Sequence, residues 1–502
     1  MTWAELHGVL RGRGLVTADV ALRAQAAVGP VSGIAYDSRA VTGGQVFVAL
    51  RGQKTDGTAF AQQAISRGAA AIVSEQPAPH GVSIPWTIVT DARVALAALA
   101  AEFYHHPSRE MQVVGITGTN GKTTTAYLLA AIFDAAGLRS GVLGTVAYRI
   151  GKEIRESTRT TPEAPDVQAL LREMVDRGCG ACAMEVSSHA LSLRRVDDVI
   201  FAAAVFTNLT RDHLDFHRDM EGYFQAKRRL FEMLPHSAPS VINVDDPRGA
   251  SLVEVGGRSV TYAITKAADI MPGPLSFTID GLTFDIRTPR GTIHVRSKLV
   301  GRPNVYNILA AAGAAAALDV PFDAIEHGLH DLEGVPGRFE VVSGVKDEVT
   351  VVVDYAHTDD ALRNLLETAR PLAHGRVITV FGAGGDRDRT KRPLMGAVAG
   401  RMSDVIVITS DNPRSEDSTQ IIDEILRGLT PDTRKDSGQR VMTIPDRHDA
   451  IVKAVELARA GDLVLIAGKG HEKYQVIGDR TLPFDDVAVA RDALARRRTR
   501  VV

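Results

Sequence analysis

The apolar positions along the chain fall into short β-branched runs that alternate with longer segments of helical density. Such alternation predicts parallel sheets covered by helices. It begins with a small pattern near the N-terminus, restarts near residue 113 and restarts again near residue 351. The predicted strands are 46–50, 70–73, 113–117, 141–146, 181–186, 200–206, 240–243, 351–354, 377–381, 405–409 and 463–467.

Three features interrupt this alternation. Asp280-Gly281 and Arg290-Gly291 are hairpin signals, and they predict an antiparallel flap beside the main sheet. The Ala-rich segment from Pro303 to Leu318 predicts a buried helix, and Gly334 to Arg338 has the composition of a hinge. We therefore predict an α/β protein of three domains, with boundaries at 1–108, 109–337 and 338–502.

Composition narrows the possible partners and the compartment. The 502 residues carry a formal net charge of -2, which favours neither nucleic acid nor anionic lipid. No apolar run reaches the length of a membrane span, and the N-terminus shows no secretory signal, so we expect no membrane insertion. Two cysteines cannot form a disulfide scaffold, so we expect a protein of the reducing cytoplasm. We also expect a monomer.

The two cysteines, Cys179 and Cys182, have the C-x-x-C spacing of redox motifs. A redox pair normally lies at the start of a helix, whereas this pair leads into the predicted strand 181–186. A structural role is therefore favoured. His105 and His106 form an adjacent pair in a linker, where solvent exposure is favoured over metal binding.

The segment 113–125, VVGITGTNGKTTT, has the order of strand, glycine loop, Lys-Thr and helix that cradles a phosphate. Glycines bring backbone N–H groups close to a phosphate, and the helix N-terminus adds partial positive charge. Lys122 can reach the outer phosphates, and the Thr123 hydroxyl can face Mg²⁺. The glycines fall at 115, 118 and 121, and Ile116 stands where the common pattern has glycine. We therefore predict a variant phosphate loop at the start of the middle domain.

Polar clusters follow other predicted strands of the same domain. Glu185 to His189 follows one strand, Asn208 to Asp215 follows the next, and Tyr223 to Phe231 lies in the helix after it. If their strands are neighbours, these clusters meet at the phosphate loop. Glu185 and His213 would then join Thr123 as metal ligands, although a histidine ligand is unusual for Mg²⁺.

Together these motifs resemble the Mur ligases, the ATP-dependent amide-forming enzymes of peptidoglycan synthesis, over nearly the whole chain. The most similar members are those that add the third residue of the peptide. The resemblance is carried by residues 37–39, 118–124, 160–162, 185–189, 207–213, 215–217, 227–231, 301–304, 337–340, 354–357, 411–414 and 468–472. It implies an N-terminal UDP-binding domain, a central ATPase and a Rossmann-like C-terminal domain that holds an amino acid.

The resemblance also implies roles for single residues. ATP would be held by Gly118, Thr119, Asn120, Gly121, Lys122, Thr123, Thr124, Asn304, Arg338 and Asp354, and two Mg²⁺ sites by Thr123, Glu185, His213 and Lys227. Lys227 matches a lysine that CO₂ carbamylates, which would turn a poor cation ligand into an anionic one. From the sequence alone, a surface lysine in the basic run 227–229 is favoured, and the family motif reverses that preference. Lys122, Glu185, His213 and Lys227 are the expected catalytic set.

The UDP-linked substrate would contact Ser38, Thr160, Thr161, Ser187 and Arg195. Two neighbouring positions depart from the family pattern, because Arg159 stands where asparagine is common and Leu193 where glutamine is common. Contacts from those two side chains are in doubt. Asp359 replaces a frequent proline, for which we expect little consequence.

The resemblance places the amino-acid pocket at Arg387, Asp411, Asn412, Pro413, Arg414, Gly468 and Glu472. Arg414 is typical of members that add meso-2,6-diaminopimelate, whose extra carboxylate a guanidinium can bind at two points. The implied reaction joins this amino acid to UDP-N-acetylmuramoyl-L-alanyl-D-glutamate through an acyl phosphate. Alternatives are a lysine-adding relative, a folylpolyglutamate synthetase, and a nucleotide-binding regulatory module without catalysis.

Overall fold

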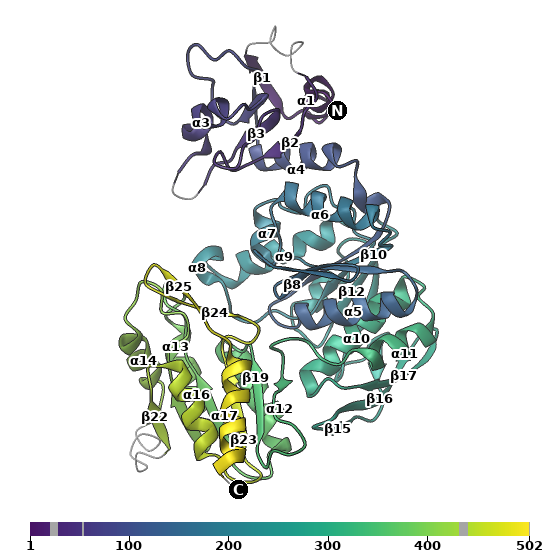
Figure 1. The fold of residues 1–502 in the computed structure, drawn as a ribbon. Helices are drawn as coiled ribbons and strands as arrows, with labels where there is room; N and C mark the ends of the chain where they lie inside the picture. Colours follow the sequence, from purple (N-terminus) through teal and green to yellow (C-terminus); the bar gives the residue numbers. More distant parts are fainter. Residues whose placement is uncertain (21–28, 53–54, 431–439, 501–502) are drawn as a thin grey trace.

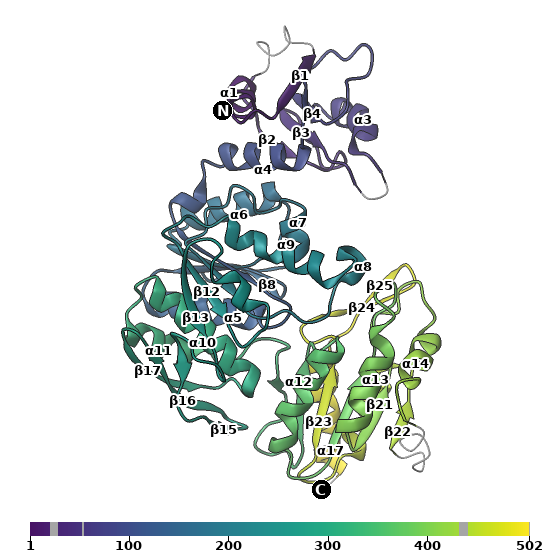
Figure 2. The ribbon, with the colours of Figure 1, turned by 180° about the vertical axis from the view of Figure 1, so that it is seen from behind.

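The computed structural model describes residues 1–20, 29–52, 55–430 and 440–500, and places three α/β parts one after another along the chain (Figure 1). Each part has its own sheet, formed from a continuous stretch of sequence. The view from behind shows the C-terminal part beside the central one, with the N-terminal part at the far end of the central part (Figure 2). This arrangement supports the division at 108 and 337, which we keep as a proposal.

The N-terminal sheet has the order β1-β5-β4-β3-β2, and only β1 is antiparallel to its neighbour. It joins the central part through Tyr36, whose hydroxyl donates to Asp166 at 2.7 Å, and through an ion pair between Arg13 and Asp198 at 2.6 Å. Its elements are α1 (Trp3–Gly12), β1 (Val16–Val20), β2 (Gly33–Ala35), β3 (Gln45–Ala49), η1 (Gly57–Phe60), α3 (Ala61–Ser66), β4 (Ala71–Ser74), β5 (Trp86–Val89), α4 (Ala92–Phe103) and η2 (Pro107–Arg109).

The central sheet has the order β13-β12-β11-β6-β10-β7-β8-β9, with the strand of the phosphate loop in its interior. β6 pairs in parallel with both β10 and β11, so the ends of these three strands lie side by side. Its strands are β6 (Gln112–Thr117), β7 (Ser140–Leu143), β8 (Ala147–Ile150), β9 (Glu153–Glu156), β10 (Ala181–Glu185), β11 (Ala203–Phe206), β12 (Pro239–Asn243) and β13 (Arg258–Tyr262).

The predicted strands of this sheet are present, with shorter ends than expected. The strand predicted at 141–146 ends at Leu143, and the one predicted at 200–206 begins at Ala203. The antiparallel edge strands β8 and β9 were not predicted. β9 is the tetrapeptide EIRE, largely exposed, so it carries no alternation of buried and exposed positions that a sequence pattern could reveal.

Helices cover both faces of the central sheet. The predicted hairpins form a small antiparallel sheet in which β14, β15 and β17 all pair with β16, and the buried Ala-rich helix α10 packs beside α5. These elements are α5 (Lys122–Ala135), α6 (Ala164–Asp176), α7 (Ser188–Ser192), α8 (Leu214–His217), α9 (Met220–Glu232), η3 (Gly249–Leu252), β14 (Met271–Pro272), β15 (Ser276–Thr278), β16 (Gly281–Thr288), β17 (Gly291–Ser297), α10 (Arg302–Ala317) and α11 (Phe322–Asp331).

The C-terminal sheet has the order β18-β19-β23-β20-β21-β22 and is parallel except for the edge strand β18. Helices α12, α13 and α14 cover one face, and α16 and α17 cover the other. The elements are β18 (Glu340–Val341), β19 (Thr350–Asp354), α12 (Asp359–Ala369), η4 (Arg370–Leu372), β20 (Val377–Phe381), α13 (Lys391–Met402), β21 (Val405–Ile408), α14 (Ser418–Leu426), β22 (Val441–Thr443), α16 (Arg447–Leu457), β23 (Leu463–Ala467), β24 (Tyr474–Ile477), β25 (Arg480–Pro483) and α17 (Asp486–Arg500).

Two observations concern the predictions from composition. Among the described residues, no helix is both long enough and apolar enough to cross a membrane. Cys179 and Cys182 are buried free thiols, and Cys182 lies in β10 as expected. Burial raises the pKa of both thiols, which makes them poor nucleophiles and agrees with a structural role.

A buried ion pair joins the two helices on one face of the C-terminal sheet. Arg447 donates from Nε and Nη2 to the two carboxylate oxygens of Asp486 at 2.8 and 2.7 Å. Both side chains are completely buried, and Arg447 also donates to the carbonyl of Ala467 at 3.0 Å. The pair therefore ties α16 and α17 to the end of β23.

Replacing Asp486 with alanine lowers the free energy of unfolding by about 3–5 kcal/mol, because it leaves a buried guanidinium without its carboxylate. The control is Lys473→Ala, which removes an exposed ion pair with Asp485 and changes stability by less than about 1 kcal/mol. Urea unfolding of both variants measures the difference. Equal stability of the two variants would contradict the role given to this pair.

Candidate active site

The phosphate loop between β6 and α5 is held by the polar segment that follows β11. Thr207 donates from its hydroxyl to the carbonyl of Asn120 at 2.6 Å, and Asn208 accepts from the backbone N–H of Asn120 at 2.9 Å. A Cβ on Gly118 would lie 1.9 Å from the Thr207 hydroxyl oxygen, and one on Gly121 would lie 2.3 Å from Asn307 Oδ1. Both glycines have positive φ, so no other residue suits either position.

Helix α5 begins directly after this loop, and no side chain caps its N-terminus. Its first N–H groups are therefore available for an anion, as in other phosphate sites. The Lys122 amine is folded back onto the loop, where it donates to the carbonyls of Gly118 and Thr119, each at 2.9 Å. Burial lowers the pKa of Lys122.

A second lysine reaches the same loop from helix α9. Lys227 is 1% exposed, and its Nζ donates to the carbonyl of Gly118 at 2.7 Å, the same oxygen that Lys122 contacts. The ring of Tyr223 lies 4.4 Å from this amine. Burial, followed by the nearby charge of Lys122, lowers the pKa of Lys227 well below its usual range. The sequence alternative of a surface lysine is therefore wrong.

Glu185 ends β10 and is 1% exposed. Both of its carboxylate oxygens accept hydrogen bonds from Thr145, at 2.8 Å from the backbone N–H and 3.0 Å from the hydroxyl. Within the described residues, no cationic side chain forms an ion pair with it. A buried carboxylate with only neutral partners is a suitable ligand for a cation.

His213 caps the short helix α8 with a left-handed backbone, φ 53°. The side chain is about half exposed, and its ring packs at right angles to that of His189 with ring centroids 4.9 Å apart. Partial burial lowers the pKa of His213 to about 3, although the Asp212 carboxylate, 3.4 Å from its Nε2, acts in the opposite direction, so the ring is neutral at pH 7. A neutral ring keeps a nitrogen lone pair for a metal.

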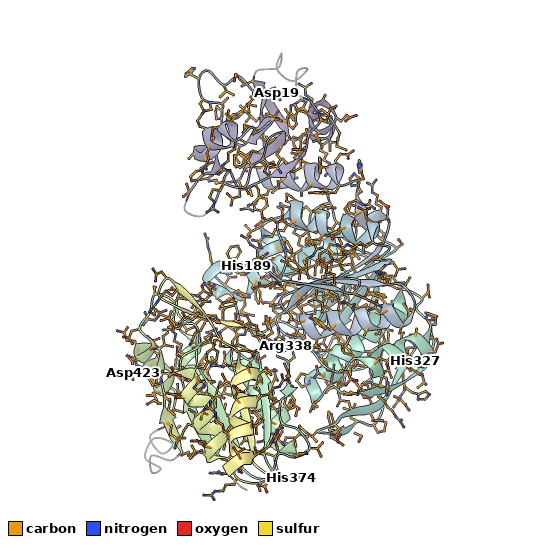
Figure 3. All side chains as sticks on the ribbon, viewed as in Figure 1. Asp19, His189, His327, Arg338, His374 and Asp423 are labelled. Carbon is orange, nitrogen blue, oxygen red and sulfur yellow. The ribbon has the colours of Figure 1, made fainter. Side chains whose placement is uncertain are left out.

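The C-terminal part completes this site through the segment after the hinge. Arg338 donates to the Thr123 hydroxyl at 3.1 Å, and its guanidinium lies 4.7 Å from the centre of the Tyr355 ring. Asp354 accepts from the backbone N–H groups of Phe339 and Ala356, at 2.7 and 2.8 Å. Figure 3 shows Arg338 between the central and C-terminal parts, and His189 on the side of the central part that faces the C-terminal one.

A cavity of about 760 Å³ opens beside the phosphate loop, between the antiparallel sheet and α12 with the turn that follows it. It has polar residues at the loop and mainly apolar ones at the far end, which is the usual character of a small-molecule site. Asn304 lines a smaller adjoining cavity together with Arg338 and Asp354. The sequence analysis missed the apolar wall, formed by Ile264, Leu275, Phe277, Pro371 and Leu372.

The residues expected for the UDP-linked substrate fall into two places. Thr161 donates to the Glu185 carbonyl at 2.8 Å and accepts from the Ser187 N–H at 3.1 Å, and Arg195 donates to the Thr161 carbonyl at 3.1 Å. Thr160 lies beside them, with its hydroxyl 3.0 Å from that of Thr145. Ser38 instead lies in the N-terminal part, where it donates to Gln63 at 2.7 Å.

The two positions that depart from the family pattern have ordinary local roles. Arg159 forms an ion pair with Glu163 at 2.5 Å, and Leu193 is the C-cap of α7. Asp359 is the first residue of α12, directly after the N-cap Thr358. A proline would also suit that first helical position, so the change has little structural consequence.

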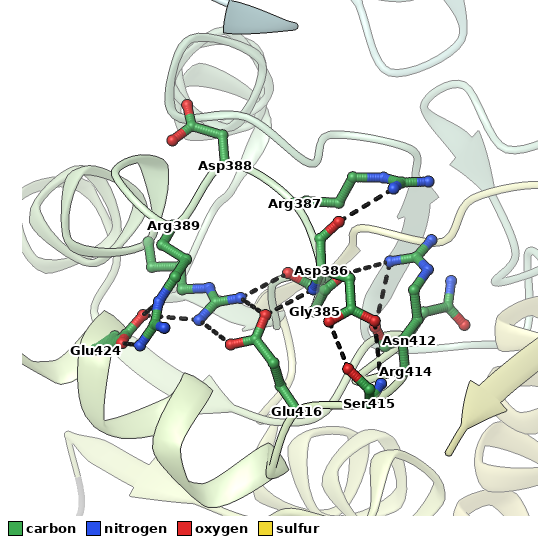
Figure 4. A network of polar contacts seen from close by, with 12 residues as sticks. Gly385, Asp386, Arg387, Asp388, Arg389, Asn412, Arg414, Ser415, Glu416 and Glu424 are labelled. Carbon is green, nitrogen blue, oxygen red and sulfur yellow. Dashed lines mark hydrogen bonds and ion pairs between the residues drawn. The ribbon is translucent and has the colours of Figure 1, made fainter. Parts of the chain in front are cut away.

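The residues expected for the amino acid meet at the carboxyl ends of β20, β21 and β23. The Asn412 amide donates to Glu472 at 2.9 Å, and a Cβ on Gly468 would lie 2.7 Å from Asp411 Oδ2. Arg414 has a left-handed backbone, φ 52°, and Nη1 donates to the Gly385 carbonyl at 2.8 Å. Arg387 and Arg414 extend to the same side of the loop at 385–389 (Figure 4). Pro413 lies between Asn412 and Arg414 in this turn.

Models of known protein families match this chain in three consecutive stretches. Residues 30–104 match the Mur ligase family catalytic domain, residues 116–315 the Mur ligase middle domain, and residues 337–470 the Mur ligase glutamate ligase domain. The chain belongs to the Mur ligase family. It is therefore an ATP-dependent, ADP-forming ligase, as the phosphate loop and the family resemblance indicated.

Individual relatives match this chain over most of their length. This Mur ligase is 48% identical over 474 residues to UDP-N-acetylmuramoyl-L-alanyl-D-glutamate--2,6-diaminopimelate ligase of Geobacter metallireducens, covering 91% of the chain and 92% of the relative. It is 46% identical to UDP-N-acetylmuramyl-tripeptide synthetase of a Roseiflexus species, covering 93% and 94%. Similarity to a solved 2,6-diaminopimelate ligase gives a TM-score of 0.66 at 35% identity, covering 93% and 96%.

More distant structures share the fold alone. The MurF ligase of Thermotoga maritima in complex with ADP gives a TM-score of 0.64 at 20% identity, covering 93% of this Mur ligase and 98% of that chain. The folylpolyglutamate synthase of Mycobacterium tuberculosis gives 0.60 at 18% identity, covering 81% and 94%. The predicted three-domain α/β architecture is thus confirmed.

Sequence reasoning also missed residues that only the fold brings to the site. Asn307, one turn beyond Asn304 on α10, occupies the space beside Gly121. Asp360 on α12 accepts from the Asn120 amide at 3.2 Å and so joins the phosphate loop to the C-terminal part. Arg211 reaches across in the other direction and donates to Thr390 at 2.7 Å. Their positions in loops and helices give no motif by which the sequence could reveal them.

Proposed function

We propose that this enzyme adds meso-2,6-diaminopimelate to UDP-N-acetylmuramoyl-L-alanyl-D-glutamate, with ATP converted to ADP and phosphate, in the synthesis of peptidoglycan. The observation that carries the proposal is that Arg387 and Arg414 extend to the same side of the loop at 385–389, while Asn412, two residues before Arg414, donates to Glu472 at 2.9 Å. The relatives that are 45–48% identical and named 2,6-diaminopimelate ligases support the same choice.

The chemical logic of the pocket follows from its charges. The far end of meso-diaminopimelate carries both an ammonium and a carboxylate, whereas lysine has the ammonium alone. Arg387 and Arg414 suit the carboxylate, and Glu472 with Asp411 suits the ammonium. Within the described residues, Arg414 forms no ion pair with a protein carboxylate, so its guanidinium charge is open to a ligand.

The reaction takes place in two steps. A carboxylate oxygen of D-glutamate bonds to the γ-phosphorus of ATP as the bond to ADP breaks, which yields an acyl phosphate. The amine nitrogen then attacks the acyl carbon, loses a proton and forms the amide as the carbon–oxygen bond to phosphate breaks. Lys122, the loop N–H groups and Arg338 stabilise negative charge on the phosphates.

Thr123, Glu185, His213 and a carbamylated Lys227 would hold Mg²⁺ at two sites, where the metal would neutralise phosphate charge. The donor set fits such ions, because Glu185 is buried with neutral partners and the His213 ring is neutral. Carbamylation requires a neutral amine, which attacks CO₂ and releases a proton. The lowered pKa of Lys227 supplies that amine.

Further roles complete the proposal. Thr160, Thr161, Ser187 and Arg195, with Ser38 in the N-terminal part, contact the UDP-linked substrate, and Asn304, Arg338 and Asp354 contact the nucleotide. Gly118 to Thr124 surround its phosphates, and Arg387 and Asp411 to Arg414 with Gly468 and Glu472 form the amino-acid pocket. The enzyme acts as a cytoplasmic monomer.

The test is an amino-acid screen with the UDP-linked dipeptide, ATP and Mg²⁺. We expect amino-acid-dependent phosphate release with meso-diaminopimelate and little with L-lysine or L-ornithine. Arg414→Ala should raise the KM for meso-diaminopimelate by about 10–100-fold, because the substrate carboxylate loses a charged hydrogen-bond partner. The KM for ATP should stay within about twofold. Activity with lysine but not with meso-diaminopimelate would reject the proposal. Activity with folate in place of the UDP-linked dipeptide, or ATP binding without any turnover, would also reject it.

A further inference from the structure

Lys469 lies in the turn after β23, inside the C-terminal part. Its side chain is completely buried. The glycines on both sides have positive φ, 118° at Gly468 and 54° at Gly470. These left-handed residues turn the lysine inward, and the turn packs so closely that a Cβ on Gly470 would lie 2.8 Å from the Gly337 carbonyl oxygen.

The Lys469 ammonium lies among the polar groups of the amino-acid pocket. It donates to Asn412 Oδ1 at 3.1 Å and to Glu472 Oε2 at 2.9 Å, and it lies 3.8 Å from Asp411. The ring of Tyr474, in the first strand of the following hairpin, lies 5.7 Å from it. One buried cation thus joins the turn after β23 to the loop after β21.

The hydrogen bonds fix how Glu472 is presented. Oε2 accepts from both Lys469 and the Asn412 amide, each at 2.9 Å. Asn412 is held in turn, because its Oδ1 accepts from Lys469 and from the Val476 N–H at 2.9 Å. In the described part of the chain, Oε1 of Glu472 has no hydrogen-bond partner, so this oxygen remains for a ligand.

The charges of the cluster are unequal. Asp411 and Glu472 carry two negative charges against the single positive charge of Lys469, while Arg447 nearby is matched by Asp486. The carboxylates of Asp411 and Glu472 thus lie at one point of the pocket. The arginines of the neighbouring loop place positive charge at another point (Figure 4). This separation suits the zwitterionic end of a diamino acid.

We propose that Lys469 is a positioning residue for amino-acid selection, which locks Glu472 and Asn412 so that one carboxylate oxygen of Glu472 receives the distal ammonium of the substrate. The inference rests on the proposed function, since it concerns the same pocket. Lys469 does not touch the substrate and acts through Glu472.

The experiment compares Lys469→Met with Lys473→Met, the same substitution at an exposed lysine on the same segment. We expect Lys469→Met to raise the KM for meso-diaminopimelate at least about 20-fold, because Glu472 loses its charged partner, with the KM for ATP within about twofold. Lys473→Met should leave both values within about twofold. Steady-state phosphate release with each substrate varied measures the four values.

A double-mutant cycle separates positioning from mere stability. If Lys469 acts through Glu472, then K469M combined with E472Q is no more than about threefold worse in KM than E472Q alone. The inference is overturned if the two substitutions multiply their effects on KM. It is also overturned if Lys469→Met lowers the Tm and leaves the KM unchanged. If Lys469→Met does not fold, Lys469→Gln keeps a hydrogen-bond donor without the charge, and its KM decides the question.

The same measurements distinguish a failure of the proposed function from a failure of the role given to Lys469. If the wild-type enzyme does not use meso-diaminopimelate, the proposed function fails before any variant is compared. If the wild type uses it and the KM of the Lys469 variants is unchanged, the proposed function stands and only the role of Lys469 fails.

Discussion

Replacing Lys122 with methionine lowers kcat by about 10³-fold or more, since a preorganised charge at the transferred phosphate is lost. In the present structure its amine donates to the carbonyls of Gly118 and Thr119, so the charge already lies inside the loop that a phosphate would enter. Methionine keeps the length and the packing of the side chain but cannot donate. Phosphate release under saturating substrates measures the loss.

The control for this prediction is Lys266→Met, which removes an exposed lysine that donates to the Val244 carbonyl at 2.7 Å. It lies outside the loop and should leave kcat within about twofold. Circular dichroism should show both variants folded, because Lys122 contacts the backbone of a single turn. Retention of more than a tenth of the wild-type kcat by Lys122→Met would remove Lys122 from the catalytic set.

Replacing Lys227 with alanine lowers kcat by about 10²–10³-fold, and acetate or propionate restores part of the activity. Two amines share the Gly118 carbonyl, at 2.7 Å from Lys227 and 2.9 Å from Lys122, and burial lowers the pKa of Lys227 well below its usual range, which favours the neutral amine. The neutral amine can take up CO₂ and present two anionic oxygens. In the alanine variant a small carboxylate can enter the space and supply similar oxygens.

Two variants test the carbamate against simple charge. Lys227→Arg keeps a cation and fills the space, so it should be inactive and should not respond to acetate. Arg228→Ala, at the next position of the same basic run, removes an exposed ion pair with Glu232 and should change kcat by less than about twofold. Full activity of Lys227→Arg, or equal rescue of all three variants, would contradict a carbamate at this position.

The contrast between Lys227 and Arg228 shows where prediction from residues ends. The basic run 227–229 predicts exposed side chains on the surface of a helix. Helix α9 instead packs against the sheet along the face that carries Tyr223, Lys227 and Leu230. Positions three and four apart share a helix face, so the periodicity alone would allow burial of Lys227, but only the family resemblance gave it a role.

The amino-acid pocket shows a second limit. The family resemblance placed Asp411 to Arg414 and Gly468 to Glu472 in one pocket. Both segments follow parallel strands, whose carboxyl ends meet at one edge of a sheet. Strand order decides which of these ends are neighbours, and β20 lies between β21 and β23 in the sheet. The contact of Lys469 with Asn412 therefore depends on side chains that reach across one strand, and no local pattern encodes that distance.

The sequence by itself determined the class of fold and the phosphate loop, because alternating apolar runs, turn glycines and the Gly-Lys-Thr signature depend on neighbours along the chain. Only the tertiary structure decided that Lys227 and Lys122 share one carbonyl, that Arg338 reaches Thr123 at 3.1 Å, and that hairpin residues such as Phe277 line the large cavity. These contacts join residues far apart in sequence. Their energies depend on burial and distance, which follow from packing of whole elements and not from local residue types.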